Sequence, residues 1–260
     1  MQRLIADVYW VFWREMKKLG RQKSRLLMAV VQPVVWLALM GNAMSGLTNN
    51  PVAARMLGTG NYLDFMTPGV MIMTALFGGV FGGTSILWDR RIGFLNKMLT
   101  APIHRAAIPV GKLAALVVQS LFQALLIAVI ALLLGVHIVT GVPGILFMLT
   151  VASLFGLIMG GVSLSFAAVL KSHEALFAIM NFFTMPLMFT SNAIFPTQAM
   201  PEWLRWIAKF NPLSYAVGPM RTVATQGWVW REIWPGVLVL VAVAVLTTSV
   251  MIRQFNRSVA

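Results

Sequence analysis

One stretch of the chain, residues 113–170, contains no Asp, Glu, Lys or Arg. Shorter uncharged runs cover residues 26–54, 65–88, 175–201 and 233–252. A helix needs about 20 mostly apolar residues to cross about 30 Å of hydrocarbon, so each run is long enough to span a membrane. Only 10% of the residues are charged, against about 25% in soluble domains. The sequence therefore predicts an all-α polytopic membrane protein and excludes an ordinary soluble enzyme.

The same runs divide into six expected spanning helices. The 113–170 run is too long for one helix, and Gly135, Gly141 and Gly144 near its middle predict a tight turn between two helices. A six-span domain would then fill residues 26–260, after a separate N-terminal segment. The expected spans are residues 26–46, 63–87, 106–134, 143–170, 175–195 and 233–252.

The distribution of basic residues gives the expected orientation. With both termini in the cytoplasm, the inner segments hold fifteen of the 20 Lys and Arg residues, and the outer segments hold the other five. This bias is typical of membrane proteins, whose cytoplasmic loops are rich in basic residues. The concentration of basic residues on the cytoplasmic side therefore accounts for the net charge of +13, and we expect no nucleic-acid partner. The chain has no Cys, which excludes a disulfide and a Cys-ligated metal.

Residues 1–25 have the pattern of an amphipathic helix. Leu4, Val8, Phe12 and Leu19 recur at helical spacing, and basic side chains gather toward the end of the segment. Such a helix lies in the plane of the inner membrane interface, with its cations near anionic lipid headgroups. The alternative is a flexible basic leader. A cleavable signal peptide is not expected, because the segment has no long apolar region.

The inner loop between the second and third spans, residues 88–105, predicts a short helix of its own. Leu95, Met98 and Leu99 would share one face, and Pro102 would end the helix. An apolar face on a cytosolic loop needs a surface to dock on. That surface would be the membrane or a groove on a partner protein.

The longest outer segment, residues 192–231, is rich in Pro and Trp. Trp203 and Phe210 fit a short helix with Pro201 at its start, where the missing N–H has no cost. Because tryptophan is typical of the headgroup level, residues 196–220 would form a re-entrant segment at the outer leaflet. An ordinary exposed loop is the alternative.

Glycines in the second and fourth spans form a small-residue face. Gly79 and Gly83 are four residues apart, and so are Gly156 and Gly160. Such spacing lets two helices approach closely without polar contacts. The close approach would occur either within one subunit or at a dimer interface.

No catalytic constellation is apparent in the sequence. Residues 78–85 approach the phosphate-binding loop G-x-x-x-x-G-K-S/T, but Thr84 replaces the Lys that contacts phosphate. The histidines have no second ligand at helical spacing, so we expect no metal site. Asp64 opens a span, where a helix-end role is favoured over proton coupling. These observations fit a transporter that takes its energy from a separate protein.

Three motifs, in order along the chain, resemble those of ABC-2-type exporter permeases, the family of daunorubicin-type drug-resistance permeases and polysaccharide exporters. The first motif, residues 62–69, is an aromatic-rich stretch that leads into Pro-Gly at the start of the second span. An Asp-Arg-x-x-Gly pattern, followed by Leu, Pro and Arg, covers residues 89–105. Asn-Pro-Leu, with an aromatic and a later Arg, covers residues 211–221. The resemblance extends over essentially the whole chain.

This resemblance implies a transport subunit that has no catalytic residues and binds no cofactor itself. Two permease copies, expected as a homodimer, would pair with two cytosolic ABC ATPase subunits, which bind ATP and Mg, in a bacterial or archaeal cytoplasmic membrane. The N-terminal helix would be the connecting helix, and the loop helix would couple ATP hydrolysis to transport. The residues implied for ATPase coupling are Asp89, Arg90, Gly93, Leu95, Leu99 and Pro102. The residues implied for the outer gate are Pro196, Trp203, Trp206, Asn211, Pro212, Tyr215 and Arg221.

The substrate path is expected where the fifth span faces the partner chain, with a contribution from the first span. Met and Phe side chains adapt to irregular shapes, which favours a drug-like or lipid-like amphiphile moved out of the cytoplasm or the inner leaflet. A lipid-linked polysaccharide or oligosaccharide is the alternative, and a stand-alone secondary transporter is a second one. The candidate path residues are Gln32, Trp36, Asn42, Asn181, Phe182, Met185, Phe189 and Asn192.

Overall fold

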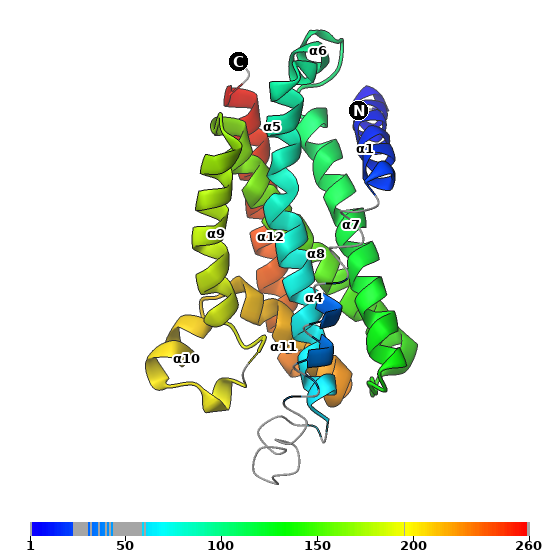
Figure 1. Ribbon diagram of the computed structural model, residues 1–260, viewed down its shortest axis with the longest axis vertical. Helices are drawn as coiled ribbons and strands as arrows, with labels where there is room; N and C mark the ends of the chain where they lie inside the picture. Colours follow the sequence, from blue (N-terminus) through cyan, green and yellow to red (C-terminus); the bar gives the residue numbers. More distant parts are fainter. Residues whose placement is uncertain are drawn as a thin grey trace.

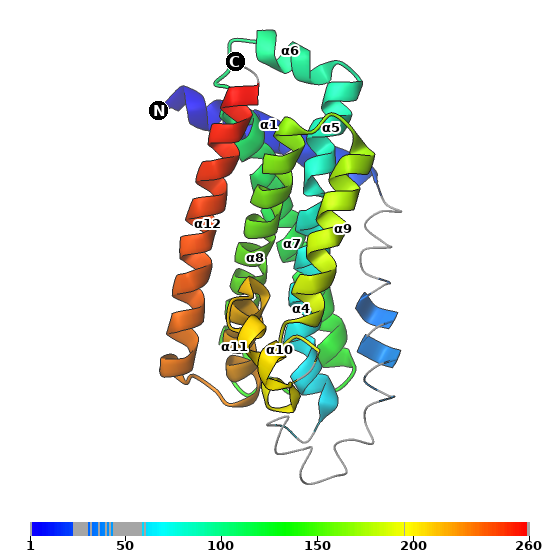
Figure 2. The same ribbon diagram turned by 90° about the vertical axis from the view of Figure 1, so that its left-hand side faces the viewer.

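The computed structural model describes residues 2–22, 61–194 and 196–258, together with residues 31, 33–35, 37–39, 41, 43 and 59. Over this part of the chain the fold is helical and contains no strand. Long helices run side by side along the molecule (Figures 1 and 2). The predicted all-α architecture is therefore confirmed for the described residues.

Four helical segments among the described residues are long and apolar enough to cross a membrane. The first consists of α4 (Tyr62–Val80), the 3-10 turn η2 (Phe81–Gly83) and α5 (Thr84–Arg91), which form one continuous segment of 30 residues. The others are α7 (Ala107–Leu133), α8 (Gly141–Val169) and α12 (Trp230–Ser258). Each contains most of one expected span, so the chain is a membrane protein.

The structure describes the two remaining expected spans less completely. α9 (His173–Phe189) has 17 residues, the lower limit of about 17–25 residues for a spanning helix. It ends before residue 195, because the chain turns at residues 190–194. The expected span at residues 26–46 lies mostly outside the described residues. Its described residues are helical, and among them Leu37 is fully buried in the core.

Five further elements belong to the described part of the chain, and they gather at the two ends of the bundle. α1 and α6 lie at the same end as both chain termini, whereas α10 and α11 lie at the opposite end (Figures 1 and 2). Figure 2 also shows α1 crossing the direction of the long helices. The elements are α1 (Gln2–Arg21), α6 (Phe94–Thr100), η3 (Thr197–Ala199), α10 (Glu202–Ala208) and α11 (Pro212–Thr225).

α8 is the central helix and packs against α4, α7, α11 and α12. Small residues allow its close approach to α4: a Cβ on Gly79 would lie 2.6 Å from Cβ of Met159. One turn further, the Gly83 amide donates to Oγ of Ser163 at 3.0 Å, and that hydroxyl donates to the Val80 carbonyl. The small-residue face therefore serves packing within one subunit.

The turn between α7 and α8 forms where the glycines predict it. Gly135 has a φ of 87°, in the left-handed region that glycine adopts most readily. The carboxylate of Asp64 accepts hydrogen bonds from the His137 amide and the Thr59 hydroxyl, both at 3.1 Å. Asp64 thus anchors this turn at the start of α4, which is the helix-end role favoured by its position in the sequence.

Candidate functional site

Five charged side chains join three helices at the end of the molecule that carries α6. Asp89 of α5 is fully buried, and its carboxylate accepts two hydrogen bonds from the Arg14 guanidinium of α1, at 2.8 and 3.0 Å. The Lys112 ammonium of α7 lies 2.5 Å from Oδ2 of Asp89 and 2.7 Å from Oε1 of Glu15. Lys18 of α1 lies 3.4 Å from Oδ1 of Asp89. We call these five residues the charge cluster.

Burial of these charges is possible because each has a partner of opposite sign. The Lys112 side chain is 1% exposed, and it meets two carboxylates and the carbonyl oxygen of Ser85. Partial burial alone would lower the pKa of Arg14, but the hydrogen bonds and charge of Asp89, with the charge of Glu15, raise it above its ordinary value. Removing one partner of a buried ion pair costs about 3–5 kcal/mol. The charge cluster therefore fixes α1 against α5 and α7.

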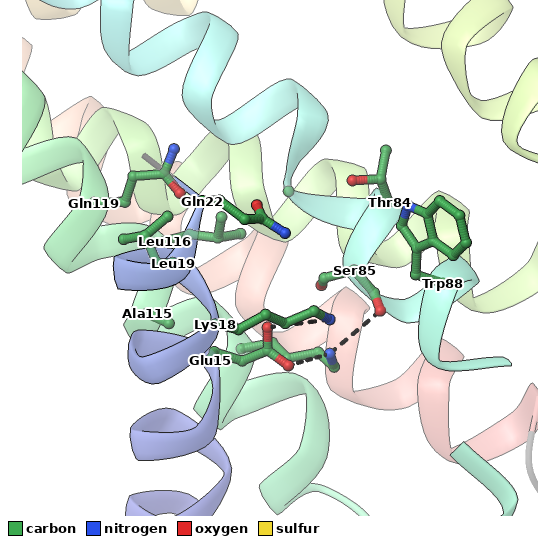
Figure 3. Close-up of a pocket in the computed structure, with 12 residues that line it drawn as sticks. Glu15, Lys18, Leu19, Gln22, Thr84, Ser85, Trp88, Ala115, Leu116 and Gln119 are labelled. Atoms are coloured by element: carbon green, nitrogen blue, oxygen red, sulfur yellow. Dashed lines mark hydrogen bonds and ion pairs between the residues drawn. The ribbon is translucent and has the colours of Figure 1, made fainter. Parts of the chain in front are cut away.

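The charge cluster extends to α6 and borders a small cavity. Figure 3 shows Glu15 and Lys18 extending from α1 toward Ser85 of α5. A cavity of about 100 Å³ lies beside them, with walls from α1, α5 and α7. The Arg14 guanidinium also lies over the ring of Phe94, 3.8 Å from its centroid, a favourable cation–π geometry. Because Phe94 is the first residue of α6, α1 contacts the start of that helix directly.

A second contact ties α1 to the far end of the same loop. The backbone N–H of His104 donates to Oδ2 of Asp7 at 3.0 Å. Asp7 and Arg14 lie about two helical turns apart on α1, so this helix contacts the loop near Asp89 and again at His104. We call this arrangement the loop clamp. It implies that a rigid displacement of α1 would move both ends of the segment that contains α6.

α6 turns its apolar side toward its own subunit. Leu95 is 3% exposed and Met98 is 6% exposed, and both belong to the core, against which Leu99 also packs. The apolar face that was expected to dock on a partner or a membrane is therefore covered by this chain. Ile92, 63% exposed, is an apolar side chain of the loop that remains accessible. The other exposed loop residues are Trp88, Arg91, Asn96, Lys97, Thr100, Pro102, His104 and Arg105.

Two further residues implied for coupling also have structural roles inside the subunit. The guanidinium of Arg90 donates to the carbonyls of Leu170 and Ala168, at 2.6 and 3.0 Å. These carbonyls lie at the end of α8, where helices leave C=O groups without intrahelical partners, so Arg90 caps α8. Gly93 has a φ of 70° and allows the chain to turn between α5 and α6.

At the opposite end, Arg221 of α11 is bound by neutral groups. Its Nε donates to the Phe65 carbonyl at 3.2 Å, and its Nη2 donates to the Ala193 carbonyl at 3.3 Å. The guanidinium lies 3.7 Å from the centroid of the Phe65 ring. Burial lowers the pKa of Arg221, although an arginine stays charged at neutral pH. Arg221 thus joins α4, α11 and the turn after α9.

The start of α11 is attached to α9 through Asn211. The amide Nδ2 of Asn211 donates to the Leu187 carbonyl at 2.7 Å, and its Oδ1 caps α11 by accepting from the Leu213 amide at 2.9 Å. Pro212 occupies the first turn of α11, where its missing N–H has no cost. The Tyr215 hydroxyl donates to the backbone carbonyl of Lys209 at 2.7 Å, which links α11 to the end of α10.

α10 presents aromatic side chains outward. Trp203 and Trp206 are 66% and 64% exposed. The predicted short helix forms: it begins at Glu202, one residue after Pro201, and ends at Ala208, before Phe210. Pro196 is half-buried and directly precedes η3. Outward-facing tryptophans at one end of a helical bundle are typical of the membrane headgroup level.

The candidate path residues on α9 point away from the core of this subunit. Phe182, Met185 and Phe189 are 72%, 61% and 55% exposed, and Asn181 is exposed beside them. Asn192 follows the helix, and its Oδ1 is buried without a hydrogen-bond partner among the described residues. The exposed side of α9 is apolar enough to be covered by lipid or by a second protein. Three further candidates lie outside the described residues: Gln32, Trp36 and Asn42.

The sequence singles out one member of the charge cluster, Asp89, and misses how the others act. Arg14 and Lys18 were expected to face lipid headgroups, and Glu15 and Lys112 were not assigned a role. The partners on different helices are 23 to 97 positions apart in the chain, so no local spacing reveals them. The sequence features that could have indicated this pairing are a Glu within a basic helix and a Lys near the start of an apolar span.

The fold and these two ends define a polytopic helical membrane protein whose loop helix is held by an N-terminal helix lying across the bundle. In the part of the chain that the structure describes, no group of three His, Asp or Glu side chains could hold a metal ion.

The chain belongs to the ABC-2 type transporter family, whose model matches residues 6–224. It is 31% identical over 232 residues to ycf38 of Porphyra purpurea, whose name describes a transport permease, with 88% of this chain and 78% of that protein covered. It is 25% identical over 209 residues to the daunorubicin resistance ABC transporter permease protein DrrB1 of Streptomyces coeruleorubidus, with 80% and 71% covered. Nodulation protein J of Rhizobium leguminosarum bv. trifolii is 23% identical over 202 residues, with 77% and 74% covered. The resemblance seen in the motifs is therefore confirmed.

Proposed function

We propose that this chain is the permease subunit of an ATP-driven exporter and that a separate ABC ATPase, which binds ATP and Mg, supplies the energy. The observation that carries the proposal is the loop clamp. α6 lies at the extreme end of the molecule, beyond α1 (Figures 1 and 2), and α1 contacts both ends of its loop. A displacement imposed on this end is passed directly to α5 and α7, which are parts of membrane spans.

The α6 end of the molecule faces the cytoplasm in this proposal. Basic residues gather on α1, on the loop around α6 and near the end of α12, as expected for a cytoplasmic side. Both termini then lie in the cytoplasm of a bacterial or archaeal cell. The six spans consist of the four long helical segments, α9 and residues 26–46. Residues 1–25 form the interfacial connecting segment, and residues 26–260 form the spanning domain.

The ATPase docks on the exposed side of the loop around α6. Leu95 and Asp89 are buried within the subunit, where they hold α6 and α1 in place. The surface available to a partner is apolar at Ile92 and basic around it. Arg91, Lys97 and Arg105 carry the positive charge. A complementary partner surface has an apolar pocket with carboxylates at its rim, since opposite charges across an interface favour association.

The substrate path runs along the exposed side of α9, completed by a second copy of the chain. This helix carries no charged residue after Glu174, and its exposed side chains are mainly Phe and Met. Such a surface suits an amphiphilic drug-like or lipid-like substrate better than a strongly charged one, since a charge within a membrane is costly. At the outer leaflet, α10 and α11 form the gate, and Arg221 holds it against α4.

The proposal is tested by co-purifying the chain with the ABC ATPase encoded beside its gene. Ile92→Glu is expected to abolish association and the stimulation of ATP hydrolysis, because it places a carboxylate at the centre of the docking surface. Val139→Glu is the matched control, since Val139 is 65% exposed and Ile92 is 63% exposed, at opposite ends of the molecule. Unaltered association of the Ile92 variant would refute the docking surface. Transport by the intact chain without any ATPase would refute the exporter proposal itself.

A further inference from the structure

An open groove of about 590 Å³ lies along α1, and its lining residues belong to this helix and to Gln22, which follows it. Trp10 and Trp13 line one part of it and are 65% and 43% exposed. Lys17 and Arg21 line the other part, and both are exposed. The groove therefore combines aromatic surface with two accessible positive charges on a single helix.

Two of the four cations that line this groove have no carboxylate partner among the described residues. Arg14 and Lys18 also line the groove, but they are committed to Asp89 and Glu15. Within the described residues, no carboxylate lies within 4 Å of Lys17 or Arg21, and the contact recorded for Lys17 is with the Trp13 ring, at 5.6 Å. Two cations beside two indole rings form a surface that is complementary to an anionic amphiphile.

The position of α1 favours a lipid over a protein partner. α1 crosses the long helices on the flank of the bundle, whereas α6 extends further out at the same end (Figures 1 and 2). Tyr9 stacks on Trp13, and Ile5 is 65% exposed, so the aromatic surface continues along the helix. Exposed Trp and Tyr beside Lys and Arg are typical of the level where acyl chains meet headgroups.

We propose that this groove is a defined binding site for an anionic phospholipid. Lys17 and Arg21 bind the headgroup phosphate, and Trp10 and Trp13 contact the glycerol and the upper acyl chain. A defined site differs from general attraction of a basic helix to a charged membrane, because it depends on these two cations and not on the total charge of the protein. It goes beyond the proposed export function and does not depend on an ATPase.

The site is tested on the purified chain alone, by native mass spectrometry during titration with phosphatidylglycerol. The double variant Lys17→Gln/Arg21→Gln is expected to bind this lipid about 30-fold more weakly, since each basic residue near an anionic surface contributes about 1 kcal/mol. The control Lys97→Gln/Arg105→Gln removes two exposed cations from the same end of the molecule and is expected to bind normally. A swap that keeps both charges, Lys17→Arg/Arg21→Lys, should also retain binding and shows that the helix is intact.

Three outcomes would overturn the proposal. The first is an equal loss of phosphatidylglycerol in the two Gln double variants, which would indicate general electrostatic attraction. The second is equally tight binding of phosphatidylcholine, or displacement of the lipid by inorganic phosphate. The third is normal lipid binding by Lys17→Gln/Arg21→Gln together with lost ATPase association, which would assign the groove to the protein partner. Because lipid binding is measured without the ATPase, its failure is distinguishable from failure of the export function.

Discussion

The two ends of this permease are held together by different chemistry. At the α6 end, the buried carboxylate of Asp89 binds charged side chains from two other helices. At the α10 end, the guanidinium of Arg221, the amide of Asn211 and the hydroxyl of Tyr215 donate to backbone carbonyls. One end is thus an ionic cluster, and the other is a set of separate hydrogen bonds.

This difference determines how each end responds to force. In a buried ionic cluster, each charge depends on the others, because an unpaired charge in the interior is very costly. Such a cluster keeps its helices together or fails as a whole. Single hydrogen bonds contribute about 0.5–1.5 kcal/mol each, or about 1.5–3 kcal/mol when one group is charged, and they can be exchanged one at a time. The α6 end is therefore suited to transmit a displacement, and the α10 end to open in steps.

The largest expected effect comes from breaking the charge cluster. Asp89→Ala leaves the buried ammonium of Lys112 and the Arg14 guanidinium without their main partner, so the free energy of unfolding should fall by about 3–5 kcal/mol. Unfolding of the purified chain in lipid bicelles measures this loss.

The double variant Asp89→Ala/Lys112→Met is the control for this prediction. It removes the most deeply buried of the stranded cations, so it should be more stable than the single variant. A loss below about 0.5 kcal/mol for Asp89→Ala, as for an ordinary surface change, would show that the cluster does not hold this end together.

A smaller loss is expected from the corresponding change at the α10 end. Arg221→Met removes the hydrogen bonds to the carbonyls of Phe65 and Ala193, which should cost about 1–3 kcal/mol in the same unfolding measurement. Arg221→Lys should recover only part of this, because an ammonium cannot reproduce the planar fork of a guanidinium. Arg231→Met is the matched control, since Arg231 is exposed at the start of α12, at the same end of the molecule (Figure 2), and should change stability little. If the Arg221 variant is less stable than Asp89→Ala, the proposed contrast between the ends is wrong.

The sequence predicts the long helices because hydrophobic length is a local property. The uncharged runs and the glycines at the α7–α8 turn place four spans within a few residues of their observed positions. The spacing of Leu95, Met98 and Leu99 also indicates that they share one face of a short helix. Periodicity does not reveal what covers that face, and the structure shows that the same subunit covers it.

The charge cluster could not be predicted, because the pairing of its charges is not a local property of the sequence. Its members come from three helices and meet only after these have packed, so their pairing depends on tertiary geometry. A basic residue in an amphipathic N-terminal helix fits a lipid headgroup as well as a buried carboxylate. The position of Arg14 alone therefore does not decide between the two, whereas the bidentate geometry with Asp89 does.

A matched pair of glycines tests whether the two ends differ in function as well as in stability. Gly93 and Gly135 have φ values of 70° and 87°, and neither would bring a Cβ within 4 Å of another group. Replacement by Ala should therefore cost about 1–2 kcal/mol at each position, through backbone strain alone. Only Gly93→Ala should reduce ATPase stimulation in the complex, because it changes the turn that leads into α6. Equal ATPase defects in the two variants would show that strain, not the loop, limits coupling.

The smallest changes in stability are expected when the single hydrogen bonds that tie α1 and α11 to their neighbours are removed. An effect on function can here be separated from an effect on stability. Tyr215→Phe removes the solvent-exposed hydrogen bond to the Lys209 carbonyl and should cost only about 0.5 kcal/mol, with ATPase stimulation unchanged. Asp7→Ala should affect stability little, because the hydrogen bond that it removes is solvent-exposed. It should nevertheless lower the ATPase stimulation by substrate, since it releases the far end of the α6 loop from α1 while the charge cluster stays intact. If Asp7→Ala leaves coupling unchanged, the contact at Asp89 alone transmits the movement, and the clamp acts at one end of the loop instead of two.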